Sequence, residues 1–224
     1  MSTNESSCIS QSSIDKDLKK TGQELIRYDL VTDYGKEIEC YLRRIERETQ
    51  LKANHLEAHE VRAAYRAKMV DWMCEVLGVA YKSTCTDQTF FLAVSLLDRY
   101  IQALEARNEV FKSSDLHLTG VTCMFIASKY EDMIPLYLNT VFAKIGHSKL
   151  STESILAKEQ DILRALGFRI GAPTALEYIG CLFESVPSLR DHPEKCLLQN
   201  ISIYLSKMAL HHLELYTKPT SLIA

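Results

Sequence analysis

Two pairs of oppositely charged side chains stand out in this sequence because they interrupt apolar runs. Arg66 lies among apolar helical positions, and Asp98 follows Leu96 and Leu97 directly. A charge in such a place is stable only when it is paired, since breaking a buried ion pair costs about 3–5 kcal/mol. We therefore expect Arg66 and Asp98 to form a buried ion pair between neighbouring helices; two separate solvated charges are the alternative.

Lys129 and Glu159 form the second pair, and each lies at the polar margin of an otherwise apolar helix. If these helices are neighbours, the two charged groups meet at the surface. An exposed ion pair adds only about 0–1 kcal/mol to stability. Such a pair is better suited to recognition than to holding the fold together, although two ordinary surface charges remain the alternative.

Common catalytic and metal-binding patterns are missing from the sequence. It has no Gly-rich phosphate loop, no Gly-x-Ser-x-Gly turn and no His-Glu-x-x-His motif. His55 and His59 have helical i, i+4 spacing but no third ligand nearby, and the seven cysteines show no Cys-x-x-Cys or zinc spacing. We expect no enzyme activity, no metal and no cofactor, and we interpret Cys74 and Cys123 as buried thiols.

The composition indicates an ordinary soluble globular protein, with 46% hydrophobic and 25% charged residues in 224. A net charge of −3 gives no general attraction to nucleic acid or to an anionic membrane. The unpaired cysteine pattern favours a reducing compartment, the cytosol or the nucleus. The first residues lack the apolar core of a secretory signal, and no run is long enough to be a transmembrane helix.

The element that must organise the fold is a helix predicted over 114–133. Between Leu116 and Ala127 its residues are apolar or small on every side, except for His117. A helix that is apolar all round is enclosed by other elements. Its polarity changes abruptly from Ser128 onward, so it surfaces with a charged end, and we expect Ser114 to cap its start.

The rest of the chain shows helical periodicity and no strand-like alternation, which predicts an all-α fold. Before these helices, 1–33 is expected to be a disordered, serine-rich tail. Polar loops are expected at 51–60 and 187–193, and Thr86, Ser151 and Thr174 are predicted helix caps. Helices are expected at 34–50, 61–81, 87–104, 138–145, 151–166, 174–186 and 194–216.

These residues and their spacing resemble the cyclin box, over about 33–186. The similarity rests on Arg66-Ala-Lys-Met-Val-Asp-Trp-Met-Cys-Glu-Val, Leu97-Asp-Arg-Tyr, Ala127-Ser-Lys-Tyr-Glu-Asp, Glu159 and Leu166-Gly-Phe-Arg-Ile-Gly-Ala-Pro-Thr. The forms of the first and third motifs are most similar to mitotic A- or B-type cyclins. The resemblance implies an all-α, five-helix box around a central buried helix, followed by an incomplete second cyclin-like repeat.

The domains implied are a tail at 1–33, an accessory helix at 34–50, a first box at 61–167 and the start of a truncated second box at 173–224. The function implied is an activating regulatory subunit of a cyclin-dependent protein kinase in cell-cycle progression, in the nucleus and cytoplasm. The resemblance implies that Arg66, Asp98 and Leu118 belong to the internal framework. The kinase-binding residues implied are Lys129, Tyr130, Glu131, Glu159, Phe168, Ile170, Tyr41 and Ile45.

A second site implied by the resemblance is a groove through which kinase substrates dock. The matching residues there are Met69, Trp72 and Glu75. The sequence departs from the family at Lys68, where an apolar residue is usual, at Ser113, where a basic one is common, and at His117, where a glutamine is common. These departures bear on the docking of short Arg-x-Leu peptides. The alternative for Trp72 is a side chain that is partly core.

The C-terminal part reaches only the opening of what would be a third helix of the second box. The chain is therefore expected to be either a fragment or a protein with a reduced second half. Apolar residues expected to lack their usual cover are Leu176, Ile179, Leu182, Ile201 and Leu205. Near the N-terminus, the short pattern from Arg27 to Leu30 is a weak destruction-box-like signal.

The alternative function is a cyclin-box adaptor in transcription that activates no kinase. The acidic balance of the chain argues against contact with DNA, and so do the mitotic-like motif forms. We expect neither nucleic acid nor a membrane among the partners.

Overall fold

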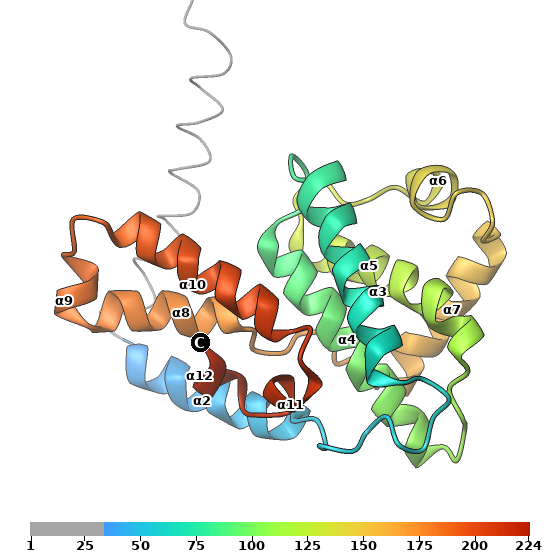
Figure 1. The fold of residues 1–224 in the computed structure, drawn as a ribbon, viewed down its shortest axis with the longest axis horizontal. Helices are drawn as coiled ribbons and strands as arrows, with labels where there is room; N and C mark the ends of the chain where they lie inside the picture. The colour runs from blue at the N-terminus through green and yellow to red at the C-terminus, as the bar shows by residue number, and fades with distance from the viewer. Residues whose placement is uncertain (1–33) are drawn as a thin grey trace, which may run out of the picture.

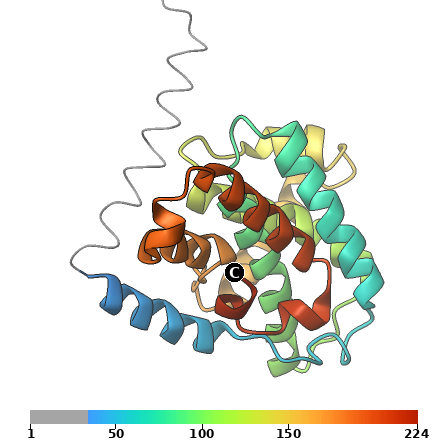
Figure 2. The same cartoon turned by 60° about the vertical axis from the view of Figure 1, so that its left-hand side comes forward.

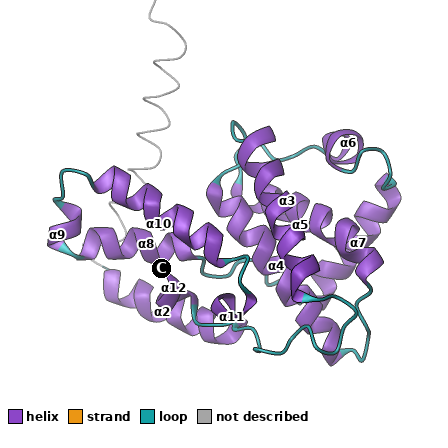
Figure 3. Cartoon of the chain, in the orientation of Figure 1, coloured by secondary structure: helices purple, strands orange, loops and turns teal. Residues whose placement is uncertain are grey.

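All regular structure in the described part of the chain, residues 34–224 of a computed structural model, is helical (Figure 3). Residues 1–33 lie outside that description, and so does the pattern from Arg27 to Leu30. None of the described helices is both long and apolar enough to cross a membrane. The helices of the first half are α2 (Gly35–Thr49), α3 (Ala63–Glu75), α4 (Asp87–Ala106), α5 (Leu116–Glu131), α6 (Leu138–Thr140) and α7 (Thr152–Ala165).

The C-terminal helices are α8 (Ala175–Ser185), α9 (Pro187–Arg190), α10 (Lys195–Ala209), α11 (Leu213–Tyr216) and α12 (Thr220–Ile223). α8 and α10 pack against each other, and α12 packs on α8. α2 runs alongside these C-terminal elements, although it comes first in the chain (Figures 1 and 2). The first and last described helices, α2 and α12, therefore lie close to each other.

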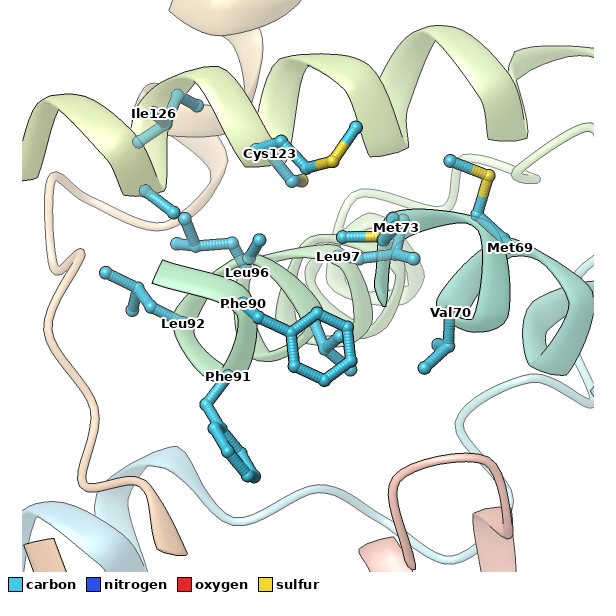
Figure 4. Packing of buried hydrophobic residues seen from close by; sticks show 14 of the residues in the cluster. Met69, Val70, Met73, Phe90, Phe91, Leu92, Leu96, Leu97, Cys123 and Ile126 are labelled. Atoms are coloured by element: carbon cyan, nitrogen blue, oxygen red, sulfur yellow. The ribbon is translucent and has the colours of Figure 1, made fainter. Parts of the chain in front are cut away.

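α5 lies at the centre of the first half and packs against α4, α7 and α3 (Figure 1). Its buried positions run without a break from Thr119 to Ser128, so no face of this stretch is left to solvent. The central buried helix predicted from the sequence is confirmed. Figure 4 shows the core it shares with α3 and α4, built from Met69, Val70, Met73, Phe90, Phe91, Leu92, Leu96, Leu97, Cys123 and Ile126.

Three of the four predicted caps form. The Thr86 side chain accepts a hydrogen bond from the Thr89 backbone N–H, and Ser151 does the same for Ser154. Thr174 and Glu177 make a capping box at the start of α8. The Ser114 cap was wrong: residues Ser113–Asp115 form a 3₁₀ turn that leads into α5, and the Ser114 hydroxyl donates to the Asp115 carboxylate instead.

Two C-terminal segments differ from the sequence-based expectation. The expected loop at 187–193 contains α9, which has Pro187 in its first turn, where a missing N–H costs nothing. The helix expected over 194–216 ends at Ala209. The next residue, Leu210, has a buried side chain, and its backbone carbonyl accepts a hydrogen bond from Arg66 Nη1 at 2.6 Å.

The C-terminal helices leave part of their apolar surface uncovered. Leu182, Ile201 and Leu205 are exposed, as expected, whereas Leu176 is half-buried and Ile179 is buried. Exposed apolar side chains on successive turns of a helix are typical of surfaces that are covered by other protein.

Candidate functional site

A buried ion pair joins α3 to α4. Arg66 donates from Nε to Asp98 Oδ1 at 2.8 Å and from Nη2 to Oδ2 at 2.6 Å, and both side chains are fully buried. Burial alone would raise the pKa of Asp98, but the charge and hydrogen bonds of Arg66, helped by His55, outweigh it and hold that pKa below its usual value. The predicted ion pair is confirmed. Because both side chains are fully buried, it holds α3 against α4 and is not available to a binding partner.

His55 is a third member of this buried cluster, and the sequence analysis missed it. Its Nε2 lies 3.6 Å from Asp98 Oδ1, and its Nδ1 lies 2.9 Å from the Lys52 carbonyl oxygen. The connector at 51–60 appeared polar, yet its apolar residues Leu51 and Leu56 are buried and carry the histidine inward. These two leucines on either side of His55 are the signal that could have identified it.

The Lys129 ammonium and the Glu159 carboxylate form an ion pair that joins the end of α5 to α7. The Lys129 side chain is 38% exposed and that of Glu159 is 12% exposed, so the pair lies at the surface but not fully in water. Lys129 Nζ also lies 4.0 Å from the centroid of the Phe125 ring. The ring and the carboxylate together hold the lysine in one place and leave one side of it open.

An open cleft of about 1150 Å³ lies between α2, α4, the end of α5 and the segment after α7; it begins at Tyr130, the residue after Lys129, and neither Lys129 nor Glu159 lines it. Six of the eight predicted kinase-binding residues line it: Tyr41, Ile45, Tyr130, Glu131, Phe168 and Ile170. Tyr41, Tyr130 and Phe168 expose about half or more of their surface. Exposed aromatic side chains around a concavity are typical of a protein-binding surface.

The segment after α7 is held in place from α4. Arg99 donates from Nη1 to the Ile170 carbonyl at 2.9 Å and from Nη2 to the Arg169 carbonyl. Gly167 and Phe168 have φ values of 57° and 60°, which turn the chain sharply and direct the Phe168 ring to solvent. Arg99 was not predicted as a site residue, because its role depends on contacts with residues about seventy positions away.

Side chains of both charges line the cleft, and a carboxylate, Glu131, lies at the end of α5. Burial raises the pKa of this half-buried group, and the nearby Glu177 and Asp132 carboxylates raise it further. A positively charged side chain of a bound protein would relieve that repulsion. At Glu131, the cleft is therefore suited to a basic side chain of a partner.

A second, shallower groove of about 520 Å³ lies at the predicted substrate-docking site. Met69 and Trp72 line it as predicted, whereas Glu75 is exposed and lies outside its lining. Trp72 is half-buried and its ring centroid lies 5.1 Å from that of His117. The other residues that line this groove are Tyr65, Lys68, Ser113, Leu116 and His147.

A buried carboxylate, Glu46, helps to position α2, which carries Tyr41 and Ile45. Glu46 accepts hydrogen bonds from the Ser221 backbone N–H at 2.7 Å and from the Ser221 hydroxyl at 3.0 Å. Replacing Glu46 by alanine removes both hydrogen bonds from the half-buried Ser221, at a cost of about 0.5–1.5 kcal/mol each. We expect faster hydrogen exchange in α2 and α12 of Glu46→Ala, with no change in α5; unchanged exchange in α2 would show that other contacts hold it.

Comparisons with known proteins agree with this architecture. Residues 37–171 match the family model for the cyclin N-terminal domain. G2/mitotic-specific cyclin-B1 from Oryzias luzonensis is 35% identical over 150 residues, which are 67% of this chain and 35% of the relative. Cyclin-A2 from Xenopus laevis is 30% identical over 189 residues, which are 84% of this chain and 42% of the relative.

Among solved structures, a viral cyclin from herpesvirus saimiri superposes with a TM-score of 0.66 at 20% identity, over 81% of this chain and 76% of that one. This superposition supports the fold alone. The chain spans less than half the length of the two curated cyclins, and its matched region contains the central helix and the ion-paired surface. The chain therefore belongs to the cyclin family, with A- and B-type cyclins among its relatives.

Proposed function

We propose that this chain is an activating regulatory subunit of a cyclin-dependent protein kinase in cell-cycle progression, in mitosis and in the nucleus and cytoplasm. The observation that carries the proposal is the surface-exposed Lys129–Glu159 ion pair beside a cleft lined by Tyr41, Tyr130 and Phe168. The names of the relatives, G2/mitotic-specific cyclin-B1 and cyclin-A2, support the same role.

The mechanism is a shift in the populations of the kinase. A mobile helix of the kinase packs against the surface at the ends of α5 and α7, and this contact favours the conformation in which the catalytic Lys–Glu pair of the kinase can form. Moving an equilibrium from 1:99 to 99:1 needs about 5.5 kcal/mol of differential binding. In this proposal the chain supplies that energy through contact and contributes no catalytic group.

Reversing either charge of the surface pair tests the proposal. We expect Lys129→Glu and Glu159→Lys each to weaken binding of a purified cyclin-dependent kinase by about thirtyfold or more, since truncating or reversing a hydrogen-bonded charge at an interface costs about 2–5 kcal/mol. Calorimetric titration measures the affinity, and phosphorylation of a model peptide measures activation. Lys82→Glu, an exposed reversal outside the cleft lining, is the matched control.

The double swap, Lys129→Glu with Glu159→Lys, separates recognition from stability. It restores an ion pair between α5 and α7 but presents the charges to the kinase in the wrong order. We expect the melting temperature of the swap to recover and the kinase affinity to stay low. If the melting temperature and the kinase affinity both recovered, the ion pair would have a structural role only. If each single variant bound the kinase as tightly as the wild type, this surface would not be the kinase-binding surface.

A chain that bound no cyclin-dependent kinase at all would reject the proposed function. Salt-dependent DNA binding without kinase activation would support the adaptor alternative instead.

A further inference from the structure

The most deeply buried side chain of α2 makes a polar contact with the C-terminal helices. Among the described side chains of α2, only that of Glu46 is buried, with 8% of its surface exposed. Its two carboxylate oxygens accept hydrogen bonds from the backbone N–H and the hydroxyl of Ser221, in α12, which lies beside α2 in Figure 1. The helix that carries Tyr41 and Ile45 is therefore attached at its most buried point to a serine hydroxyl.

The groups around this contact are poorly suited to a second negative charge. Burial and the charge of Glu46 raise the pKa of Tyr178, on α8, to about 12, and its buried hydroxyl has no hydrogen-bond partner among the described residues. Arg43 lies one turn before Glu46 on α2, and its Nε already donates to Glu39 at 2.9 Å. An anion at Ser221 would therefore lie against a buried carboxylate.

Ser221 lies in a segment that an enzyme can reach. α12 is a single helical turn, and helices this short have little stability of their own. Ser221 is half-buried, and Leu222 beside it is 77% exposed. Lys218 is exposed three residues before Ser221, and basic residues near a serine are among the charge patterns by which protein kinases select substrates. Such spacing is common in proteins; what distinguishes Ser221 is the buried carboxylate that its hydroxyl contacts.

We propose that Ser221 is a phosphorylation site, and that its phosphorylation releases α2 from the C-terminal helices. In a protein kinase that selects basic substrates, the Ser221 oxygen attacks the γ-phosphorus of ATP and an O–P bond forms. The bond from that phosphorus to the bridging oxygen of the β-phosphate breaks, ADP leaves, and the hydroxyl proton goes to the catalytic aspartate of that enzyme. The product has lost the hydroxyl donor and carries a charge of about −1.5 to −2, which repels the Glu46 carboxylate.

Release of α2 would alter the cleft, because Tyr41 and Ile45 form part of its lining. Without the contact between Glu46 and Ser221, these two side chains lose one of the contacts that hold them beside α4 and the segment after α7. The consequence for kinase binding rests on the proposed function. The release itself does not, and it can be measured on the free chain.

Hydrogen exchange of the complete chain, phosphorylated at Ser221 by incorporation of phosphoserine through an expanded genetic code, tests the release. We expect exchange in α2 to become at least about tenfold faster than in the unmodified chain, and exchange in α5 to stay unchanged. Phosphorylation at Ser83, which is exposed before α4, adds the same charge elsewhere and should leave α2 unchanged. Unchanged exchange in α2 after phosphorylation at Ser221 would overturn the inference.

Glu46→Gln separates charge repulsion from other effects of the phosphate. The amide keeps an oxygen that accepts from the Ser221 N–H, and its NH₂ group donates to a serine or phosphate oxygen. We therefore expect phosphorylation at Ser221 to change exchange in α2 of Glu46→Gln by less than about twofold. Equal acceleration in Glu46→Gln and in the wild type would show that the phosphate acts by its bulk. Slower exchange in the phosphorylated wild type would show that Arg43 binds the phosphate, and either result would overturn the inference.

Incubation of the complete chain with ATP and a purified protein kinase that prefers basic residues before its serine tests the modification itself. We expect mass spectrometry to find phosphate on Ser221, and Lys218→Ala to slow its addition by at least about fivefold. Phosphate on other residues only would overturn the assignment. Failure here is distinguishable from failure of the proposed function, because a chain that released α2 on phosphorylation but bound no cyclin-dependent kinase would support this inference and reject that function.

Discussion

Replacing Asp98 by alanine is expected to lower the free energy of unfolding by about 3–5 kcal/mol, because it leaves the Arg66 guanidinium buried without its partner. Both side chains of this pair are fully inaccessible to solvent. This loss is large, because the free energy of unfolding of a typical domain is only about 5–15 kcal/mol. Arg66 would keep its hydrogen bond to the Leu210 carbonyl, which can satisfy only one of its donors.

Urea denaturation followed by circular dichroism measures this change. The matched control is Lys52→Ala, which removes the exposed ion pair of Lys52 with Glu105 and should leave the unfolding midpoint nearly unchanged. If Asp98→Ala were as stable as the wild type, water or a rearranged side chain would be compensating the charge of Arg66. The packing of α3 against α4 would then not depend on the ion pair.

The pH dependence of stability follows from the same pair. Because the folded-state pKa of Asp98 is lower than its unfolded value of about 3.9, the stabilisation is complete at neutral pH. It is lost as the pH falls through the folded-state pKa. The difference in stability between wild type and Asp98→Ala should therefore shrink below about pH 4.

Local rules of sequence were enough to predict the centre of the fold. The uninterrupted apolar character of 116–127 predicted an enclosed α5, and charges within apolar runs predicted the pairing of Arg66 with Asp98. The caps at Thr86 and Ser151 followed from residue type and position alone. Each of these depends on interactions within one helix or on a single strong penalty, the burial of an unpaired charge.

Features that depend on distant segments could not be predicted in this way. α10 ends before Leu210, whose carbonyl accepts a hydrogen bond from Arg66, 144 residues earlier in the chain. His55 is buried by a connector whose composition is polar, and Arg99 is bound to backbone carbonyls after α7. In each case the controlling contact joins segments whose proximity exists only in the folded chain.

The arrangement of the predicted kinase-binding residues around one cleft also depends on distant segments of the chain. Its residues were named from a resemblance, but their arrangement around one cleft requires α2 to lie against the C-terminal helices. The hydrogen bonds of Glu46 to Ser221, which link positions 175 residues apart, provide that placement. The periodicity of α2 alone does not indicate which elements this helix packs against.

The second large effect is expected at Phe168, whose side chain is 68% exposed. Replacing it by glycine should weaken kinase binding by about 2 kcal/mol or more, about thirtyfold, since aromatic anchors dominate protein interfaces. The fold should tolerate the change. Phe168 has a φ of 60°, and a non-glycine residue in that region carries a strain of about 1–2 kcal/mol that glycine relieves. The greater chain entropy of glycine offsets about 0.5–1 kcal/mol of that gain.

Affinity and stability should therefore move independently in Phe168→Gly, which a purely structural role of the ring would not allow. Calorimetric titration with the kinase and a thermal melt of the free chain measure the two quantities. Tyr137→Ala removes an aromatic side chain of similar exposure, 67%, outside the cleft and should bind normally. If Phe168→Gly bound the kinase as tightly as the wild type, the exposed ring would not be an anchor. If it melted much earlier, the ring would be holding the segment after α7, and the strain at this position would have a structural rather than a recognition role.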